Sequence, residues 1–330
     1  MKIAVVILNW NGAKLLQQFL PSIIQHSENA SIYVADNAST DDSITVLKNE
    51  FPTIKIIQNT SNFGFAKGYN EALQFVEESY YALVNSDIEV TANWLEPVIK
   101  IFENEPETAI IQPKILDYKN KSYFEYAGAA GGFIDKFGYP YCRGRIFETL
   151  EQDNGQYDDT TEIFWATGAC FFIRKEVYKT LKGFDADFFA HQEEIDLCWR
   201  AFNLGYKTKY TSKSVVYHVG GATLDVANPK KTYLNFRNSL FMLLKNLPSN
   251  QLVSILFFRM LLDGIAAFKF LLQGKVKHFF AVGKAHFSFY QKTTLFYSKR
   301  SDKQLTNYFH TKSIVWSYFV KKTKKFLDLL

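Results

Sequence analysis

Residues 80–90 read YYALVNSDIEV, a stretch in which an apolar run typical of a buried strand stops at a polar triplet. Asn85, Ser86 and Asp87 are common turn formers, so a plain turn is one interpretation of the triplet. The other is that Asp87 marks the carboxyl end of a strand, where a carboxylate can contact a ligand. The segments on either side of this stretch decide between the two interpretations.

The first 116 residues alternate between short β-branched runs and segments with helical periodicity. Strands are predicted at residues 3–8, 32–35, 54–58 and 80–84, each followed by a helix, and again at TAIIQPKIL (108–116). Strands that alternate with helices predict βαβ units and a parallel sheet with right-handed crossovers. The sequence thus predicts an α/β fold with a mostly parallel, Rossmann-like sheet flanked by helices.

Polar residues follow each of the first four predicted strands. In chain order they are Asn9 and Asn11, Asp36 and Asn37, Asn62 and Gly64, and Asp87. The carboxyl ends of parallel strands meet at one edge of a sheet, and ligands bind outside that edge. The four polar loops therefore predict a binding site.

Two of these loops carry short motifs. In VADNASTDDS (34–43), Asp36 can accept hydrogen bonds from a base or a ribose, and a helix-cap cluster is the alternative. In NFGFAKGYN (62–70), the glycines permit a close backbone approach to a ligand, with a purely structural role equally open. The second motif is neither a Walker loop nor GxGxxG, which disfavours binding of ATP or a dinucleotide.

The segment HQEEIDLCWRAFNLG (191–205) has apolar residues at helical spacing and a stop at Gly205. Glu193 and Glu194 fall in the first turn of this predicted helix, where its dipole favours anions. The two residues either are ordinary acidic residues of the first helical turn or include a general base. A general base needs a partly enclosed carboxylate. The aromatic run GFDADFFAH before the pair can supply that enclosure.

His218 stands between apolar neighbours in a predicted strand, VVYHVG (215–220). A lone strand histidine is more often a satisfied core residue, and a metal ligand is the alternative. Oxygen ligands with one imidazole suit Mn²⁺ or Mg²⁺ better than zinc.

The composition is that of a chain with a large core, because 47% of the 330 residues are hydrophobic and 17% are aromatic. Three widely spaced cysteines without a CxxC pair indicate a reducing compartment and argue against disulfides or a cysteine zinc site. The start, MKIAVVILNWNG, is interpreted as a first strand and not as a signal peptide. Residues 117–161 are less regular, and they form either a loop that closes over a ligand or an ordinary long excursion.

The net charge of +5 conceals two unlike parts. Residues 230–330 contain 18 Lys and Arg but only three acidic residues, a balance of +15, while residues 1–229 carry −10. Basic residues interleaved with Phe and Leu suit helices that lie in an anionic membrane interface, and helices packed on the preceding part of the chain are the alternative. Nucleic acid is disfavoured as a partner because no recognised motif for it is present.

Seven segments in this order resemble glycosyltransferase family 2, the inverting enzymes of the GT-A fold, and within it the rhamnosyltransferase-like branch. They are VVILNWNG, VADNASTDDS, NFGFAKGYN, LVNSDIEV, WATGACFFIRKEVY, GFDADFFAHQEEIDLCWRAFNLGYK and VVYHVGG, spanning about residues 3–224. The resemblance implies a GT-A catalytic domain over residues 1–228. Its nucleotide-sugar half would be 1–116 and its acceptor half 117–228, with a basic helical region at 229–330.

The resemblance also implies roles for individual residues. Asp87 would touch a Mg²⁺ or Mn²⁺ ion that bridges the donor diphosphate, with help from His218. Glu194 is our candidate base, with Glu193 the other member of the acidic pair. The implied nucleotide-binding residues are Asn9, Asn11, Asp36, Asn37, Asn62, Gly64, Lys67, Asn85 and Ser86. Those implied to meet acceptor or phosphate are Trp165, Thr167, Gly168 and Arg237.

The function expected from these residues is inverting transfer of a sugar from a UDP- or dTDP-sugar, with dTDP-rhamnose among the candidates. The acceptor would be a glycan or lipid-linked glycan in cell-surface polysaccharide synthesis. The expected location is the inner face of the cytoplasmic membrane, contacted peripherally through 230–330, and a homodimer is left open. A sugar nucleotidyltransferase and a non-catalytic nucleotide-sugar-binding scaffold are the alternatives.

Overall fold

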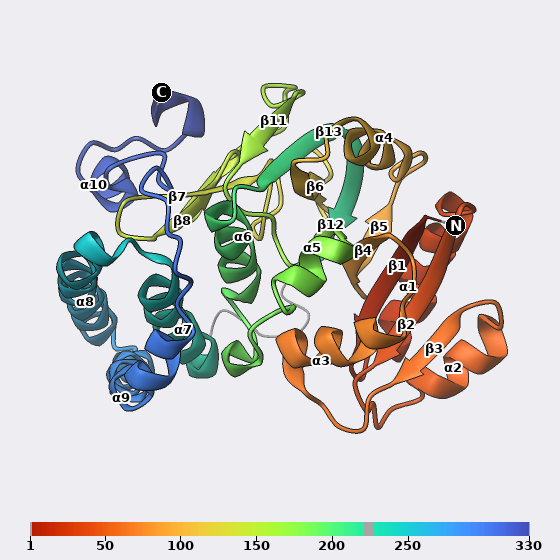
Figure 1. The fold of residues 1–330 in the computed structure, drawn as a ribbon, viewed down its shortest axis with the longest axis horizontal. Helices are drawn as coiled ribbons and strands as arrows, with labels where there is room; N and C mark the ends of the chain where they lie inside the picture. The colour runs from red at the N-terminus through yellow and green to blue at the C-terminus, as the bar shows by residue number, and fades with distance from the viewer. Residues whose placement is uncertain (1, 221–227, 330) are drawn as a thin grey trace.

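The computed structural model describes residues 2–220 and 228–329. Gly221 of the motif VVYHVGG, and the positions up to 224 over which the resemblance was expected to extend, lie outside the described residues. The described chain forms a large main sheet between helices, a small second sheet, and a group of C-terminal helices, as Figure 1 shows.

One half of the main sheet is parallel, as predicted. It contains β1 (Ile3–Asn9), β2 (Ala30–Asp36), β3 (Lys55–Gln58) and β4 (Tyr80–Asn85), in the order β3-β2-β1-β4. Every neighbouring pair among these strands is parallel. Residues 3–7 of β1 are completely buried, because helices cover both faces of this half.

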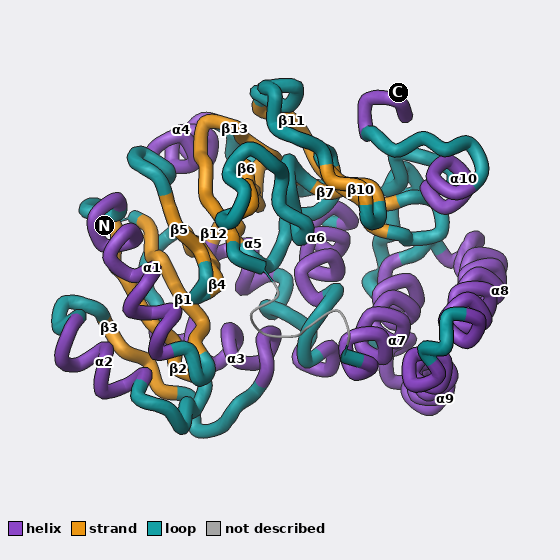
Figure 2. The backbone as a smooth tube through the Cα atoms, turned by 180° about the vertical axis from the view of Figure 1, so that it is seen from behind, coloured by secondary structure: helices purple, strands orange, loops and turns teal. Residues whose placement is uncertain are grey.

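The side chains of β1 alternate between two hydrophobic clusters. Ile3, Val5 and Ile7 pack with α1 (Ala13–His26), α2 (Ser43–Glu50) and α4 (Glu96–Asn104) on one face. Ala4 and Val6 pack with α3 (Gly64–Ala72) and with the short helix that continues it (Leu73–Phe75) on the other. The two views of Figures 1 and 2 show the sheet lying between these layers.

The other half of the sheet is mixed. The predicted strand TAIIQPKIL forms β6 (Thr108–Asp117), but it does not lie beside β4. β12 (Cys170–Arg174) lies between them and is antiparallel to both. Beyond β6 come β13 (Lys207–His218), parallel to it, and then β11 (Thr160–Ile163), while the short strand β5 (Ile88–Val90) pairs with β13.

Residues 118–159 are more ordered than the sequence indicated. They contain a separate antiparallel sheet of four short strands, β7 (Gly132–Ile134), β8 (Pro140–Cys142), β9 (Arg145–Ile146) and β10 (Thr149–Leu150). In the motif WATGACFFIRKEVY, the strand β12 runs directly into the helix α5 (Lys175–Thr180). The first residues of this motif, WATG, form the connection between β11 and β12.

The C-terminal region is helical. It contains α7 (Pro229–Asn246), α8 (Ser249–Leu272), α9 (Val276–Ser298), α10 (Ile314–Phe319) and a final turn (Phe326–Leu329). In Figure 1, α7 lies beside α6 (Glu193–Asn203), and α8 and α9 lie on its far side. Within residues 2–220 and 228–329, no helix has the length and apolar character that crossing a membrane requires.

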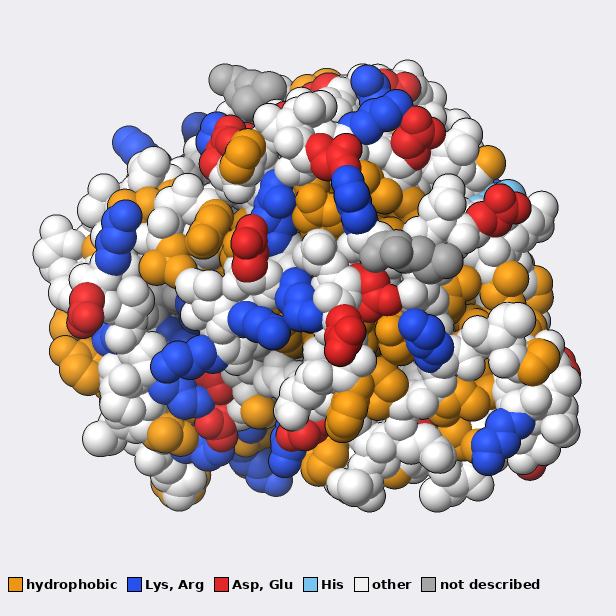
Figure 3. All heavy atoms as spheres, turned by 45° about the vertical axis from the view of Figure 1, so that its right-hand side comes forward, with side chains coloured by type: hydrophobic (Ala, Val, Ile, Leu, Met, Phe, Trp, Pro, Cys, Tyr) orange, Lys and Arg blue, Asp and Glu red, His pale blue; other side chains and the backbone are white. Residues whose placement is uncertain are grey.

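One face of the molecule has mixed charge (Figure 3). On the face that Figure 3 shows, acidic and basic side chains are interspersed among hydrophobic ones. All three cysteines, Cys142, Cys170 and Cys198, are free and buried.

Candidate active site

Asn9 and Asp36 end neighbouring strands and lie opposite each other in the sheet register. Both side chains are buried, and Asn9 Nδ2 donates a hydrogen bond of 3.1 Å to Asp36 Oδ1. The other carboxylate oxygen, Oδ2, accepts from the backbone N–H of Ser39 at 2.9 Å. Two donors thus fix the Asp36 carboxylate at the strand ends.

The loop after β1 is joined to the loop after β2. Asn11 has a left-handed backbone (φ 52°), and its Oδ1 accepts from the N–H of Thr40 at 2.7 Å. The N–H of Asn11 donates to Ser39 Oγ at 2.9 Å. Asn is one of the few residues that adopt this backbone readily, so the sequence NWNG suits the turn.

Asn37 connects the second loop to the third. Its Nδ2 donates to Asn62 Oδ1 at 3.1 Å and to the carbonyl of Gly64 at 3.0 Å. Its Oδ1 accepts from Asn59 Nδ2 at 3.0 Å. Asn59 is buried and was not singled out in the sequence, although it follows β3 directly.

The remaining residues expected at the nucleotide lie around these loops. Lys67, in α3, places its ammonium 4.2 Å from the centre of the Phe63 ring. Asn85 closes β4, and Ser86 Oγ lies near Gly12 in the loop after β1, where an added Cβ atom would be 3.7 Å away. The structure therefore brings the residues that follow β1, β2, β3 and β4 to one edge of the sheet.

Asp87 lies against His218, with 3.2 Å between Oδ1 and Nε2. The pairing of β5 with β13 places Ile88 opposite His218 and so brings Asp87 beside it. The other ring nitrogen, Nδ1, lies 3.3 Å from Glu125 Oε2. Burial lowers the pKa of His218, but hydrogen bonding to Asp87 and Glu125 outweighs it and raises the pKa to about 10.

Glu125 was missed in the sequence. It follows β6 in the less regular region, and its N–H donates to the carbonyl of Ile115. Nothing in the local pattern FEYAG sets it apart, because its place beside His218 depends on the pairing of β6 with β13.

The surroundings of Asp87 and His218 fit a divalent cation in part. In the described ranges, no three His, Cys, Asp or Glu side chains form a group that could hold a metal ion by themselves. A carboxylate on the far nitrogen of the ring is, however, common for metal-ligating histidines, and Glu125 provides it. Two protein ligands leave positions for phosphate oxygens and water, as is usual for Mg²⁺.

Glu193 and Glu194 begin α6, as the sequence predicted. Glu193 is buried, and its Oε2 has no hydrogen-bond partner among the described residues. Burial, followed by the charge of Glu194, raises the pKa of Glu193 well above its usual value. Burial also raises the pKa of Glu194, to about 7, although backbone hydrogen bonds oppose the shift.

The two carboxyl groups can therefore take different roles. The raised pKa of Glu193 favours its protonated form, whereas Glu194, which is partly exposed, has a pKa of about 7. A partly exposed carboxylate with a pKa near 7 is well matched to removing a proton from a hydroxyl group.

Trp165, Thr167 and Gly168 lie in the connection between β11 and β12, and the first two are buried. Trp165 Nε1 donates to the carbonyl of Phe133 at 2.9 Å, and the Thr167 N–H donates to Gln112 Oε1 at 2.9 Å. Gly168 approaches Phe65 of α3, which an added Cβ atom would reach at 3.1 Å. Of the three, Gly168 is the one placed beside the strand-end loops.

Arg237 lies on α7 and is buried, with its guanidinium turned toward the loop that precedes α6. It donates to the carbonyls of Asp187 (3.3 Å) and Phe188 (3.1 Å). The resemblance implied a contact with acceptor or phosphate, and the contacts present are with these two carbonyls and with the side chains of Tyr233 and Asn238.

The sequence matches known glycosyltransferases. A family model described as glycosyl transferase family 2 matches residues 4–182, which is more than half of the chain. The N-acetylglucosaminyl-diphospho-decaprenol L-rhamnosyltransferase of Mycobacterium tuberculosis (strain CDC 1551 / Oshkosh) is 20% identical over 230 residues, covering 65% of this chain and 75% of the relative.

Solved structures share the fold. A crystal structure of GalNAc-T7 with UDP, GalNAc and Mn²⁺ superposes with a TM-score of 0.59 at 15% identity, over 74% of this chain and 47% of that chain. A mannosyltransferase from Pyrobaculum calidifontis, in complex with GDP-Man and Mn²⁺, gives 0.55 at 12% identity, over 90% and 83%. These likenesses establish a GT-A-like α/β fold. The chain belongs to glycosyl transferase family 2, and it is therefore a nucleotide-sugar-dependent glycosyltransferase.

Proposed function

We propose that the chain is an inverting glycosyltransferase that moves a sugar from a nucleotide diphosphate to a hydroxyl group of a glycan or lipid-linked glycan. The observation that carries the proposal is that one fold contains two carboxyl groups suited to different roles, Asp36 and Glu194. Asp36 is fixed at the strand ends by two donors, and Glu194 has a pKa of about 7 at the start of α6. The first suits a nucleoside and the second suits a general base.

The donor would lie along the strand ends. Asp36 would accept hydrogen bonds from the base or ribose, with Asn9, Asn11 and Asn37 around it. The loop with Asn62, Gly64 and Lys67 would cover the nucleotide, and Asn85 and Ser86 would lie beneath the diphosphate. A Mg²⁺ or Mn²⁺ ion held by Asp87, His218 and the diphosphate would stabilise negative charge on the leaving group.

The transfer is a single displacement. Glu194 removes the proton of the acceptor hydroxyl while its oxygen forms a bond to the anomeric carbon. The bond from that carbon to the diphosphate oxygen breaks on the opposite face, and the nucleoside diphosphate leaves with the electron pair. One displacement inverts the anomeric centre. Burial and the charge of Glu194 raise the pKa of Glu193, which disfavours a second negative charge beside the base.

The name of the mycobacterial relative supports dTDP-rhamnose as the first donor to test and a lipid-linked diphosphate sugar as the first acceptor. It also supports the rhamnosyltransferase-like branch and a role in cell-surface polysaccharide synthesis.

The test is a panel of UDP-, dTDP- and GDP-sugars with Mn²⁺, measuring donor hydrolysis and protection against melting. We expect one donor to respond, and a panel without any response would contradict the proposal. The variant Glu194→Gln should retain donor binding but lose turnover by about 100-fold or more. Glu28→Gln, an exposed change in the turn before β2, is the matched control and should keep full turnover.

Two other functions give different results in this panel. A sugar nucleotidyltransferase would consume a nucleoside triphosphate, and the loop NWNGAKLL offers only Lys14 for a triphosphate. A binding scaffold would be indifferent to Glu194→Gln.

We also propose that α8 and α9 contact the inner face of the cytoplasmic membrane. The outward face of α8 is an apolar stripe: Val253, Phe257, Leu261, Ile265, Phe268 and Leu272 are 51–80% exposed. The one acidic residue of α8, Asp263, is completely buried. Lys269, Lys275, Lys277 and Lys284 are exposed at the end of the stripe and on α9, where they can meet anionic headgroups.

Vesicle sedimentation tests this contact. The full chain should sediment with vesicles that contain phosphatidylglycerol, and Phe257→Ser with Ile265→Ser should abolish binding. Phe75→Ser, at an equally exposed position on the catalytic domain, should not. If instead the chain ignores vesicles and forms dimers that the double variant dissociates, the stripe is an interface between copies.

A further inference from the structure

The loop that leads into α6 has an unusual backbone. Phe189, His191 and Gln192 all have positive φ angles, of 66°, 72° and 73°. Each such conformation costs about 1 kcal/mol or more for a residue with a side chain. Three of them directly before Glu193 and Glu194 must be held by contacts with the rest of the protein.

Asn238 of α7 makes the densest of these contacts. It is completely buried, and its side-chain Nδ2, which carries two N–H groups, lies within hydrogen-bond distance of three carbonyls of the loop. The distances from Nδ2 are 3.0 Å to Phe188, 2.9 Å to Ala190 and 2.7 Å to His191. One amide group thus satisfies the carbonyls that the left-handed backbone turns toward α7.

Arg237 supports Asn238. Its Nε donates to Asn238 Oδ1 at 2.9 Å, which orients the amide with its N–H groups toward the loop. Its terminal nitrogens bond Tyr233 and the carbonyls of Asp187 and Phe188. Because these contacts occupy the guanidinium of Arg237 within the protein, they favour a positioning role for Arg237 over a contact with a phosphate.

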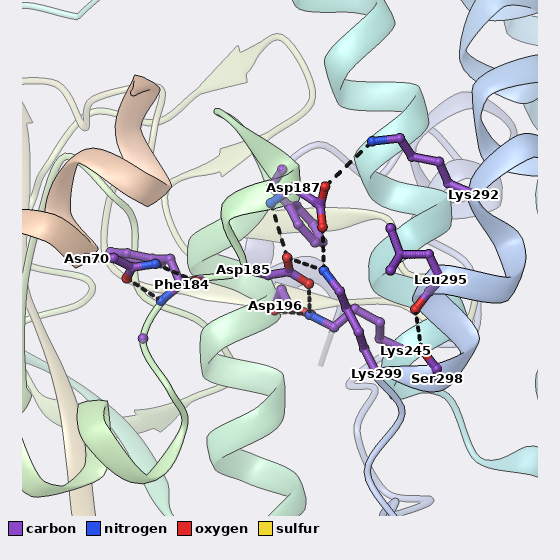
Figure 4. A network of polar contacts seen from close by, with 12 residues as sticks. Asn70, Phe184, Asp185, Asp187, Asp196, Lys245, Lys292, Leu295, Ser298 and Lys299 are labelled. Atoms are coloured by element: carbon purple, nitrogen blue, oxygen red, sulfur yellow. Dashed lines mark hydrogen bonds and ion pairs between the residues drawn. The ribbon is translucent and has the colours of Figure 1, made fainter. Parts of the chain in front are cut away.

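A second set of contacts ties the same region to α7 and α9. Lys245 lies 2.8 Å from both Asp185, before the loop, and Asp196, within α6. Lys299, which directly follows α9, lies 2.7 Å from Asp185 and from Asp187. Figure 4 shows these lysines reaching the aspartates from the C-terminal helices.

The opposite side of the loop rests on α3. The N–H groups of Phe65 and Ala66 donate to the carbonyl of Phe189, at 2.9 and 3.4 Å. The loop is therefore fixed between the helix that follows the nucleotide loop and the C-terminal helix α7.

We infer that Arg237 and Asn238 are positioning residues that set the direction of Glu193 and Glu194, so that α7 is part of the catalytic apparatus. The inference rests on the proposed function, because it takes Glu194 to be the base.

The test compares two buried asparagines in the full-length protein. Asn238→Ala removes the donors to the loop. Asn203→Ala, near the far end of α6, removes contacts with Leu305 and Asn246 and leaves the loop untouched. With the donor that the panel identifies, Asn238→Ala should lower kcat by about 100-fold and leave the donor KM within about threefold of the wild-type value. It should also shift the acid limb of the pH profile, which is the range in which kcat falls as the pH is lowered. Asn203→Ala should lower the melting temperature without moving that limb.

Hydrogen exchange supplies a measurement that needs no substrate. Amides in 188–196 should exchange at least tenfold faster in Asn238→Ala than in wild type or Asn203→Ala. The inference would be overturned if Asn238→Ala had the same kcat, pH profile and exchange rates as the wild type. It would also be overturned if Asn203→Ala lost as much kcat as Asn238→Ala. If Glu194→Gln keeps full turnover, the proposed base is wrong, while the exchange data still decide whether Asn238 holds the loop.

Discussion

The proposed role of Glu194 as the base makes catalysis depend on pH in a defined direction. Burial raises its pKa to about 7, and only its ionised form can accept the proton of the acceptor. Turnover should therefore be constant above about pH 8 and fall about tenfold for each pH unit below 7. A pH profile of kcat measures this limb. A rate that stays constant down to pH 5 would contradict the assignment of Glu194 as base.

The single carboxylate at Asp87 leads to a second prediction. The triplet Asn85, Ser86 and Asp87 offers one carboxylate, and the proposed ligands from the protein are Asp87 and His218. Mn²⁺ should bind the nucleotide-free protein weakly, and UDP or the preferred nucleotide should tighten binding at least tenfold by adding phosphate oxygens. Calorimetry measures both affinities. Tight Mn²⁺ binding without nucleotide, lost in Asp87→Ala, would contradict this account.

At the level of single residues, sequence reasoning worked where the chemistry followed a strand end. The alternation of strands and helices places Asn9, Asp36 and Asn37 at one edge, and the structure has them there. Glu125 and Asn238 could not be found in this way. Their positions depend on contacts with segments far away in the chain, and their local sequences carry no periodicity that reveals them.

At the level of elements, the start of α3 contacts the loop that leads into α6. Gly64 has φ 73°, and an added Cβ atom would lie 2.7 Å from the carbonyl oxygen of Phe189. Gly64→Ala should therefore destabilise the protein by more than the roughly 1 kcal/mol expected for the backbone alone, and it should also lower kcat. Thermal melting and turnover measure the two effects.

Gly205 is the matched control for this change. It also has a left-handed backbone (φ 93°), but nothing lies within 4 Å of an added Cβ atom. Gly205→Ala should cost only the backbone strain and leave kcat unchanged. Equal effects of the two substitutions would show that the approach of Gly64 to Phe189 has no role in catalysis.

The elements themselves were largely predictable, but their neighbours in the sheet were not. Every residue of β12 is buried, so the run CFFIR has no alternation that would indicate a direction or a partner. The register of β12 between β4 and β6 is set by packing over the whole sheet. The small sheet of β7–β10 was missed because its strands are only two or three residues long.

For the whole molecule, the ion pairs of Lys245 and Lys299 with three aspartates predict a loss of stability at low pH. The aspartates are Asp185, Asp187 and Asp196. Burial alone would raise the pKa of Asp185, but the charge and hydrogen bonding of Lys245, with further help from Lys299, lower it to about 2. A carboxyl group with a pKa of 3.8 when unfolded then contributes about 2 kcal/mol above pH 4, and this contribution is lost as the pH falls from 4 to 2.

The variant Lys245→Met should remove most of that contribution. Its stability deficit, measured by urea unfolding, should be large at pH 6 and shrink toward pH 2. The exposed pair Lys2 and Glu103 is the control, and Lys2→Met should change stability little at either pH. A deficit for Lys245→Met that does not vary with pH would indicate that the lysine acts through packing alone.

The position of β12 also constrains how the protein can be made. On the ribosome, β4 and β6 emerge well before the strand that lies between them, so the sheet stays open until residue 174 has been synthesised. Residues 1–116 and 117–228 are consequently not expected to be separate folding units. A chain that stalls between β6 and β12 would expose two unpaired strand edges, the kind of surface on which nascent chains aggregate.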